Sequence, residues 1–111
     1  AGHLEFQYTA RASHAVAKAF GAPVGKAFGI TVGSPAAIGV VMADNAVKAA
    51  TVDVVGYSSP GHGTSYSNEV ILSISGDSGA VKQAIISARE IGLKLLAQLG
   101  AEPVSDTKPY I

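Results

Sequence analysis

Residues 27–50 read AFGITVGSPAAIGVVMADNAVKAA and decide the fold, because a short apolar run passes through a turn into a helical pattern. Ala27–Val32 is short and apolar, which is typical of a buried strand. Ser34 suits a helix N-cap, and Pro35 suits the first helical position, where a backbone N–H has no helical partner. The pattern predicts a helix to about Ala50. The residues expected on or near one side of this helix are Ile38, Val41, Met42 and Val47.

Two more strands and a second long helix are predicted after this unit. Val52–Tyr57 and Val70–Ser75 are apolar runs of strand length. Asp77 or Ser78 is expected to cap the second helix, and Gly100 is expected to end it as a C′ residue. The apolar side chains that recur at helical spacing in it are Val81, Ile85, Ala88, Leu95 and Leu99.

The first residues of the chain add one strand and a short helix. Leu4–Thr9 alternates apolar and polar residues strictly, which indicates a half-buried strand. Ser13 is expected to cap a helix over Ala15–Phe20 that Gly21 ends. From Ala27 onward the order is strand, helix, strand, strand, helix, a ferredoxin-like unit without its last strand. We therefore predict an α+β fold, ferredoxin-like and circularly permuted, in which the first strand completes an antiparallel sheet beside two main helices.

Length and composition exclude several classes of protein. The 111 residues fit one domain, of which 48% are hydrophobic and only 14% charged. A surface with so little charge is expected to be partly buried against other copies. The net charge is zero and no cluster of Lys and Arg is present, so neither nucleic acid nor a membrane surface is an expected partner. The absence of Cys excludes disulfides and is compatible with the cytosol.

A polar segment separates the two strands in the second half of the chain. Residues 57–69 read YSSPGHGTSYSNE. A catalytic loop around His62, a metal site, a long hairpin turn and the lining of a hole are all open interpretations. His3, His14 and His62 are too scattered for a local metal motif, so we expect no metal and no cofactor; copies of His62 around a symmetry axis are the alternative. As a base, His62 needs an orienting carboxylate, and Glu69 is the only acid nearby.

Three motifs resemble the bacterial microcompartment (BMC) shell domain, in the order typical of that family. They are ADNAVKAA at 43–50, VDVVGY at 52–57 and GDSGAVK at 76–82. The resemblance covers roughly residues 27–99, and the strand at the front of the chain is similar to permuted members. Three further stretches resemble the C-terminal half of tandem-domain shell proteins of propanediol- and ethanol-utilisation compartments: Tyr8–Ser13, Ser58–Pro60 and Ser75–Glu90.

The resemblance implies function by assembly, without catalysis. Six shell domains, or three tandem pairs, form a hexagonal disc, and discs tile into the shell of a cytoplasmic compartment. The implied partners are copies of the chain, other shell proteins and small polar metabolites in transit. Lys48 matches the family's edge lysine and Arg89 its edge arginine, and Asp44 shares the motif of Lys48, so all three are expected at the inter-tile edge. The implied division is a permuted strand and short helix over 1–26, a BMC core over 27–100 and a tail over 101–111.

The polar segment occupies the position of the family's pore loop and is longer than the short KIGSG turn of single-domain members. Gly61 and Gly63 allow the backbone to approach an axis closely. The loop is expected either to act as a gate or to pack aside, and charging of His62 near neutral pH is a hypothesis for tuning passage. The expected pore-loop residues are Ser59, Pro60, Gly61, His62, Gly63, Thr64, Ser65 and Tyr66.

Two functions of other classes stay open beside the shell tile. Ferredoxin-like domains often bind effectors at subunit junctions, and a loop rich in Gly and Ser suits a small-molecule-binding module of that kind. An enzyme that uses His62 and Glu69 is the other alternative, although no catalytic residue is expected here.

Overall fold

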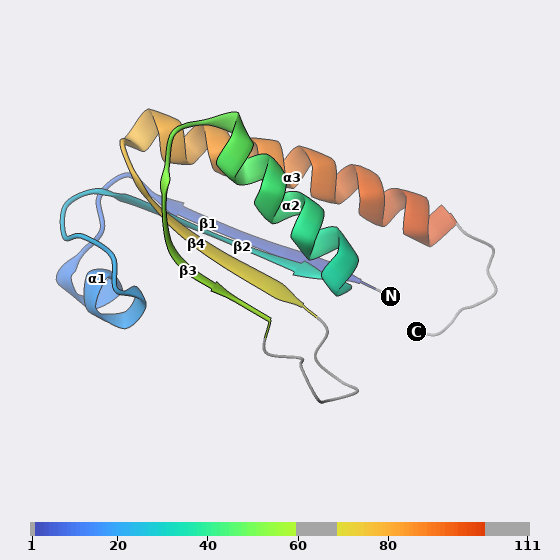
Figure 1. Cartoon of the computed structure of the whole chain (residues 1–111), viewed down its shortest axis with the longest axis horizontal. Coiled ribbons are helices and arrows are strands. Elements are labelled where there is room, and N and C mark those ends of the chain that lie inside the picture. Colours follow the sequence, from blue (N-terminus) through green and yellow to red (C-terminus); the bar gives the residue numbers. More distant parts are fainter. Residues whose placement is uncertain (1, 60–68, 102–111) are drawn as a thin grey trace.

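The computed structural model describes residues 2–59 and 69–101, and the predicted α+β architecture is confirmed (Figure 1). From the N-terminus the elements are β1 (His3–Thr9), α1 (His14–Phe20), β2 (Ala27–Ser34), α2 (Ala36–Ala49), β3 (Asp53–Ser58), β4 (Val70–Gly76) and α3 (Ser78–Ala101). The observed bounds differ from the predicted ones mainly at element ends, where side-chain patterns carry the least information.

The four strands form one antiparallel sheet in the order β1-β2-β4-β3. Strand β1 pairs with β2 from His3 opposite Ser34 to Thr9 opposite Phe28, so the first strand of the chain completes the sheet as the circular permutation requires. The pairing of β3 with β4 is shifted at Val55, which forms a bulge. Helices α2 and α3 cover one face of the sheet, and α1 lies at one end of the opposite face (Figure 1).

The main core lies between the sheet and the two long helices. Val70, Leu72 and Ile74 alternate along β4 and are buried on the face that the helices cover. Met42 of α2 and Val81 of α3 meet them from the other side, each with no exposed surface. Burial of one such side chain contributes about 1.5–3 kcal/mol, so this layer supplies most of the apolar stabilisation of the domain.

The predicted start of α2 is wrong by one residue. Ser34 is not the N-cap: it pairs with His3 and remains in β2, and Pro35 takes the N-cap position with φ −67° and ψ 167°. The carbonyl oxygen of Pro35 accepts hydrogen bonds from the N–H groups of Ile38 at 3.0 Å and Gly39 at 3.2 Å. The added strand β1 extends β2, because each further residue of β2 gains a pairing partner, and the helix therefore begins later.

The predicted apolar side of α2 is only half right. Val41 and Val47 are 38% and 39% exposed. The buried residues of α2 are Ile38, Gly39, Met42, Ala43 and Ala46. Small residues occupy the buried face because the helix approaches the sheet closely. The positions of large apolar side chains in the sequence therefore do not predict which face of α2 is buried.

The capping of α1 follows the prediction. The Ser13 Oγ accepts a hydrogen bond from the N–H of Val16 at 3.3 Å, and Gly21 follows the helix in the left-handed conformation with φ 70°. A serine cap and a left-handed glycine satisfy backbone groups that a short helix leaves unpaired, so α1 has a defined beginning and end.

Helix α3 confirms most of its predicted stripe but not its predicted end. Asp77 precedes the helix, and its carbonyl oxygen accepts the N–H of Val81 at 2.9 Å. The helix continues through Gly100 to Ala101, so Gly100 is not the C′ residue. Val81, Ile85 and Ala88 are buried and Leu95 is partly buried against the core, whereas the side chain of Leu99 lies outside the described residues. No described helix is both long enough and apolar enough to cross a bilayer.

Helix α2 touches the sheet backbone to backbone through two glycines. A Cβ on Gly39 would lie 2.6 Å from the carbonyl oxygen of Gly33 and 2.6 Å from the Cβ of Val70. A Cβ on Gly92 of α3 would lie 2.8 Å from the Met42 Sδ, so the contact between the two helices is similarly close. Contacts under 3.0 Å cannot be accommodated without a shift of the helix or the strand.

We predict that Gly39→Ala destabilises the domain by about 1–3 kcal/mol, because the added methyl group overpacks the contact between α2 and β2. The matched control is Gly79→Ala in the first turn of α3, where, apart from neighbouring residues of the helix itself, no atom lies within 4 Å of the added Cβ. Alanine favours a helix there by up to about 1 kcal/mol. Urea unfolding of both variants measures the difference, and equal stability of the two would contradict the close contact.

Candidate functional site

The polar segment begins and ends at one end of the sheet. The start of β1, the end of β2, the end of β3 and the start of β4 all lie there, as the pairs His3–Ser34, Gly33–Val70 and Ser58–Ile71 show. Residues 60–68 lie outside the described part of the chain, and with them the expected pore-loop residues from Pro60 to Tyr66. Ser59 and Glu69 are therefore the described residues on either side of the expected pore loop, and we call them its roots.

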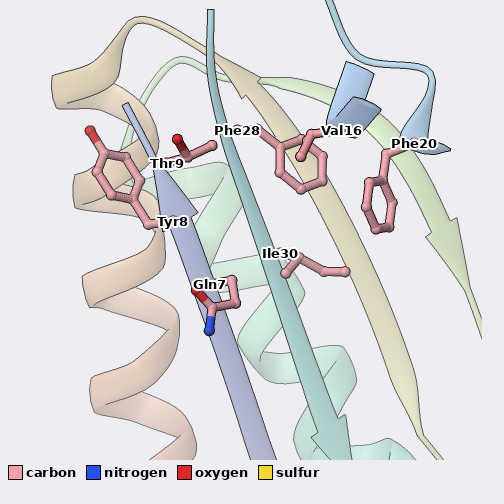
Figure 2. Close-up of a pocket in the computed structure, with 7 residues that line it drawn as sticks. All are labelled: Gln7, Tyr8, Thr9, Val16, Phe20, Phe28 and Ile30. Carbon is pink, nitrogen blue, oxygen red and sulfur yellow. The ribbon is translucent and has the colours of Figure 1, made fainter. Parts of the chain in front are cut away.

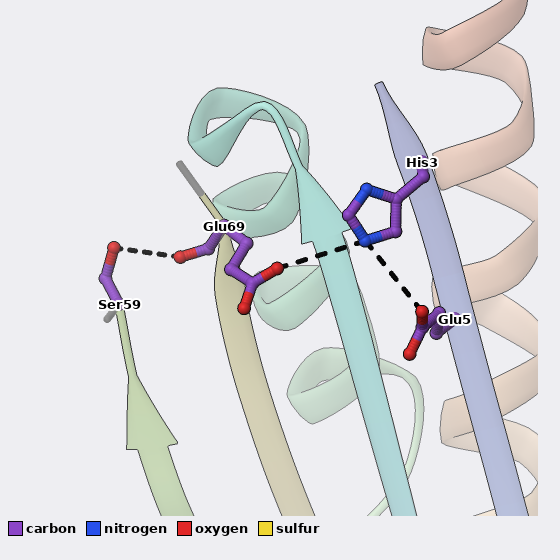
Figure 3. A network of polar contacts seen from close by, with 4 residues as sticks. All are labelled: His3, Glu5, Ser59 and Glu69. Carbon is purple, nitrogen blue, oxygen red and sulfur yellow. Dashed lines mark hydrogen bonds and ion pairs between the residues drawn. The ribbon is translucent and has the colours of Figure 1, made fainter. Parts of the chain in front are cut away.

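A hydrogen bond joins these two roots. The Ser59 Oγ donates to the carbonyl oxygen of Glu69 at 2.9 Å (Figure 3). This bond lies just beyond Ser58 and Ile71, the last pair of the β3–β4 ladder. It extends the closed end of the hairpin, so both ends of the polar segment leave the sheet from neighbouring points.

One histidine and two carboxylates gather beside this root. The His3 Nε2 lies 3.9 Å from a carboxylate oxygen of Glu5 and 3.9 Å from one of Glu69 (Figure 3). His3 is the first residue of β1, and His14 is the first residue of α1. The strand order brings Glu69 close to His3, and the expected pairing of Glu69 with His62 falls outside the described residues. The side chains of His3 and Glu5 are 52% and 70% exposed and that of Glu69 is 23% exposed. At 3.9 Å, ion pairs that water reaches contribute little.

No metal centre is found in the part of the chain that the structure describes. Within residues 2–59 and 69–101, no three or more His, Cys, Asp or Glu side chains are arranged to hold a metal ion. The cluster around His3 therefore places the carboxylates of Glu5 and Glu69 beside the root of the loop, but it does not form a metal site.

Two of the three residues expected at the tile edge form a pair on α2. The Lys48 Nζ lies 2.8 Å from a carboxylate oxygen of Asp44, one helical turn earlier, and the two side chains are 72% and 54% exposed. Lys48 is in the last turn of the helix, where a positive charge is favourable. Arg89 is exposed on α3, so the structure joins Asp44 to Lys48 and leaves Arg89 on a separate helix.

An apolar groove lies beneath α1, on the sheet face that the long helices leave open (Figure 2). Its volume is about 290 Å³. The rings of Phe20 and Phe28 lie 4.9 Å apart at 34°. No local sequence pattern marks this groove, although Val16 and Phe20 are spaced one helical turn apart. The lining residues are Gln7, Tyr8, Thr9, Val16, Phe20, Phe28 and Ile30.

Comparisons with known proteins give one consistent result. The family model described as "BMC domain" matches residues 27–104. The chain is 67% identical to the bacterial microcompartment shell protein PduB of Citrobacter freundii, over the whole chain and 41% of the relative. It is 58% identical to PduB of Limosilactobacillus reuteri, over the whole chain and 47% of that protein. The chain thus spans less than half the length of these relatives.

Solved structures agree with this result. The crystal structure of a trimeric PduB superposes with a TM-score of 0.79 at 57% identity, over 98% of this chain and 48% of that one. EtuB from Clostridium kluyveri superposes with a TM-score of 0.82 at 53% identity, over 99% of this chain and 48% of that one. In both cases the matching region is again about half of the longer chain.

We predict that Lys48→Ala changes the free energy of unfolding by less than about 0.5 kcal/mol, because an exposed i,i+4 ion pair contributes little. Urea unfolding at low protein concentration measures this value. A decrease in the free energy of unfolding above about 1 kcal/mol would show that Lys48 stabilises the domain itself and would contradict a role confined to contacts between tiles.

Proposed function

Because the chain belongs to the BMC domain family, we propose that it is one building block of a bacterial microcompartment shell. Its role there is structural: it forms part of a tile and a diffusion barrier, with no covalent chemistry. The observation that carries the proposal is 67% identity to the shell protein PduB along the whole of this chain.

The proposed tile contains six such domains. The solved PduB is described as trimeric, and this chain matches 48% of its length. Three chains with two domains each supply six positions, and the same positions are open to six copies of one domain. The partners proposed for this chain are therefore copies of itself, a second BMC domain of a tandem chain and other shell proteins, within a compartment of the cytoplasm.

The position of α2 supports a central loop and a peripheral lysine. The helix begins beside the strand ends from which the polar segment leaves, and Lys48 is in its last turn. At about 1.5 Å of rise per residue, Lys48 lies roughly 18 Å farther along the helix than Ala36. If the loops of six domains meet at an axis, Lys48 lies toward the outer rim, where we propose that Asp44, Lys48 and Arg89 contact the next tile.

The expected pore-loop residues, Ser59 to Tyr66, are proposed to line the passage for small polar metabolites. The Ser59–Glu69 hydrogen bond supports this assignment, because it holds both ends of the loop at one point of the sheet. Glycine and hydroxyl side chains in the segment can offer hydrogen bonds to a polar solute.

One observation favours a second function, the binding of a small molecule by this domain. The groove beneath α1, of about 290 Å³, is close to the lower size of ligand pockets. A ligand that raises the melting temperature in proportion to the logarithm of its concentration would support this function, and loss of the effect on Phe28→Ala would assign it to the groove.

We predict that electron microscopy shows hexagonal discs and extended sheets of the chain, and that Lys48→Ala keeps the discs but loses the sheets. The reason is that Lys48 is proposed at the rim and outside the contacts within a disc. Lys94→Ala, which removes an exposed lysine of α3, is the control and should leave sheets intact. The shell proposal fails if the chain forms no disc either alone or together with the other half of PduB.

A further inference from the structure

The groove beneath α1 has apolar walls from two elements that meet over the open face of the sheet (Figure 2). Val16 and Phe20 come from α1, and Phe28 and Ile30 come from β2. Phe28 is buried, whereas Phe20 is 43% exposed, and the two rings lie 4.9 Å apart at 34°. The exposed ring of Phe20 is therefore available to a further flat apolar group, because aromatic rings pack favourably at such separations.

Charge is distributed unevenly along the part of the chain that forms this groove. Every residue that lines it falls between positions 7 and 30. Residues 6–43 include Arg11, Lys18 and Lys26 but neither Asp nor Glu. Among the described residues, no ion pair involves any of these three cations. The groove therefore lies in a part of the chain with a surplus of positive charge.

Two of these cations are at one end of the groove. Thr9 and Phe28, which both line it, form the last pair of the β1–β2 ladder, and Arg11 and Lys26 each lie two residues beyond that pair. The N–H of Ala12 donates to the carbonyl oxygen of Lys26 at 2.7 Å, so the two segments stay side by side past the ladder. Both cations are exposed. The groove thus combines an apolar body with a positive end.

Two acidic residues share the open face of the sheet but lie farther from this end. Glu5 is one cross-strand pair beyond Gln7, in the direction away from α1. Asp53 pairs with Ser75, which pairs with Phe28, so Asp53 lies two strands from the groove, about 10 Å away. Neither carboxylate lies between the groove and its positive end.

We propose that the groove beneath α1 binds a small aromatic carboxylate, with its ring between α1 and β2 and its carboxylate at Arg11 and Lys26. This inference deepens the second proposed function, ligand binding in the groove, and rests on it. Ligand pockets combine apolar walls with a few polar or charged groups that fix the orientation of the ligand. Here the ring of the ligand packs beside Phe20, and a carboxylate is the group that a guanidinium and an ammonium both bind.

The groove is separate from the proposed passage. The roots of the polar segment lie at the end of the sheet marked by the pair His3–Ser34, whereas the groove lies at the pair Thr9–Phe28, the other end of the same ladder. The seven residues of β1 between these ends span about 20 Å. Binding in the groove and transit of a solute can therefore be measured separately.

The first test titrates three probes against the chain by saturation-transfer NMR, which reports on a single domain and on a large assembly alike. The probes are 3-phenylpropionate, 3-phenylpropan-1-ol, which keeps the apolar body without the charge, and acetate, which keeps the charge without the body. At low salt, 3-phenylpropionate is expected to bind about fivefold more tightly than the alcohol, the difference that one exposed ion pair makes. Added salt is expected to weaken the carboxylate only, and acetate is expected not to bind.

The second test uses variants of the exposed residues. Arg11→Gln and Lys26→Gln are each expected to lower the affinity for 3-phenylpropionate about two- to threefold and to leave that for the alcohol unchanged. Lys18→Gln is the matched control, because Lys18 lies about 200° around α1 from Val16 and so faces away from the groove. Phe20→Ala is expected to weaken both phenyl probes, and thermal unfolding without ligand checks that each variant remains folded.

The outcomes separate this inference from the proposed functions. Equal affinity for the carboxylate and the alcohol overturns the anionic class, while ligand binding in the groove stands. An equal loss in Lys18→Gln overturns the assigned positive end, because the charge then acts from any position. Unchanged binding in Phe20→Ala overturns the groove as the site. If no probe binds, this inference fails, and the shell proposal is decided separately by the formation of discs.

Discussion

The contact of Gly39 with Gly33 is the constraint on which the arrangement of the domain depends. Without side chains at these positions, α2 lies directly on the backbone of β2, and a Cβ at either glycine would meet an atom at 2.6–2.7 Å. This proximity lets Met42 reach Gly92 of α3, so the two helices and the sheet share one thin core. Because α2 lies so close to the sheet, small residues make up most of its buried face.

The same arrangement determines what remains exposed. Two helices packed this closely cover three strands of the sheet, and the fourth, β3, is left with apolar side chains in contact with solvent. A domain with 14% charged residues has few means of keeping such a surface solvated. Exposure of β3 therefore agrees with the proposed assembly of this domain into a tile. The bulge at Val55 places Val54 and Tyr57 on the same side of the strand.

The two ends of the domain serve different proposed tasks because α2 connects them. The roots of the polar segment, Ser59 and Glu69, are joined at one end, and the exposed pair of Asp44 and Lys48 lies toward the other. A rigid helix keeps loop and lysine at a constant separation. In the proposed tile, this separation puts the passage at the centre and the lateral contact at the rim.

The amino-acid sequence by itself determined the order and type of the elements, since alternation and helical spacing are local patterns that each segment carries alone. It also indicated the family through three motifs and the cap of α1 through Ser13. Only the tertiary structure decided that Ser34 stays in a strand, that Val47 is exposed and that His3 meets Glu69. The reason is physical: strand pairing and close packing join residues distant in sequence, and no local pattern records which backbones will touch.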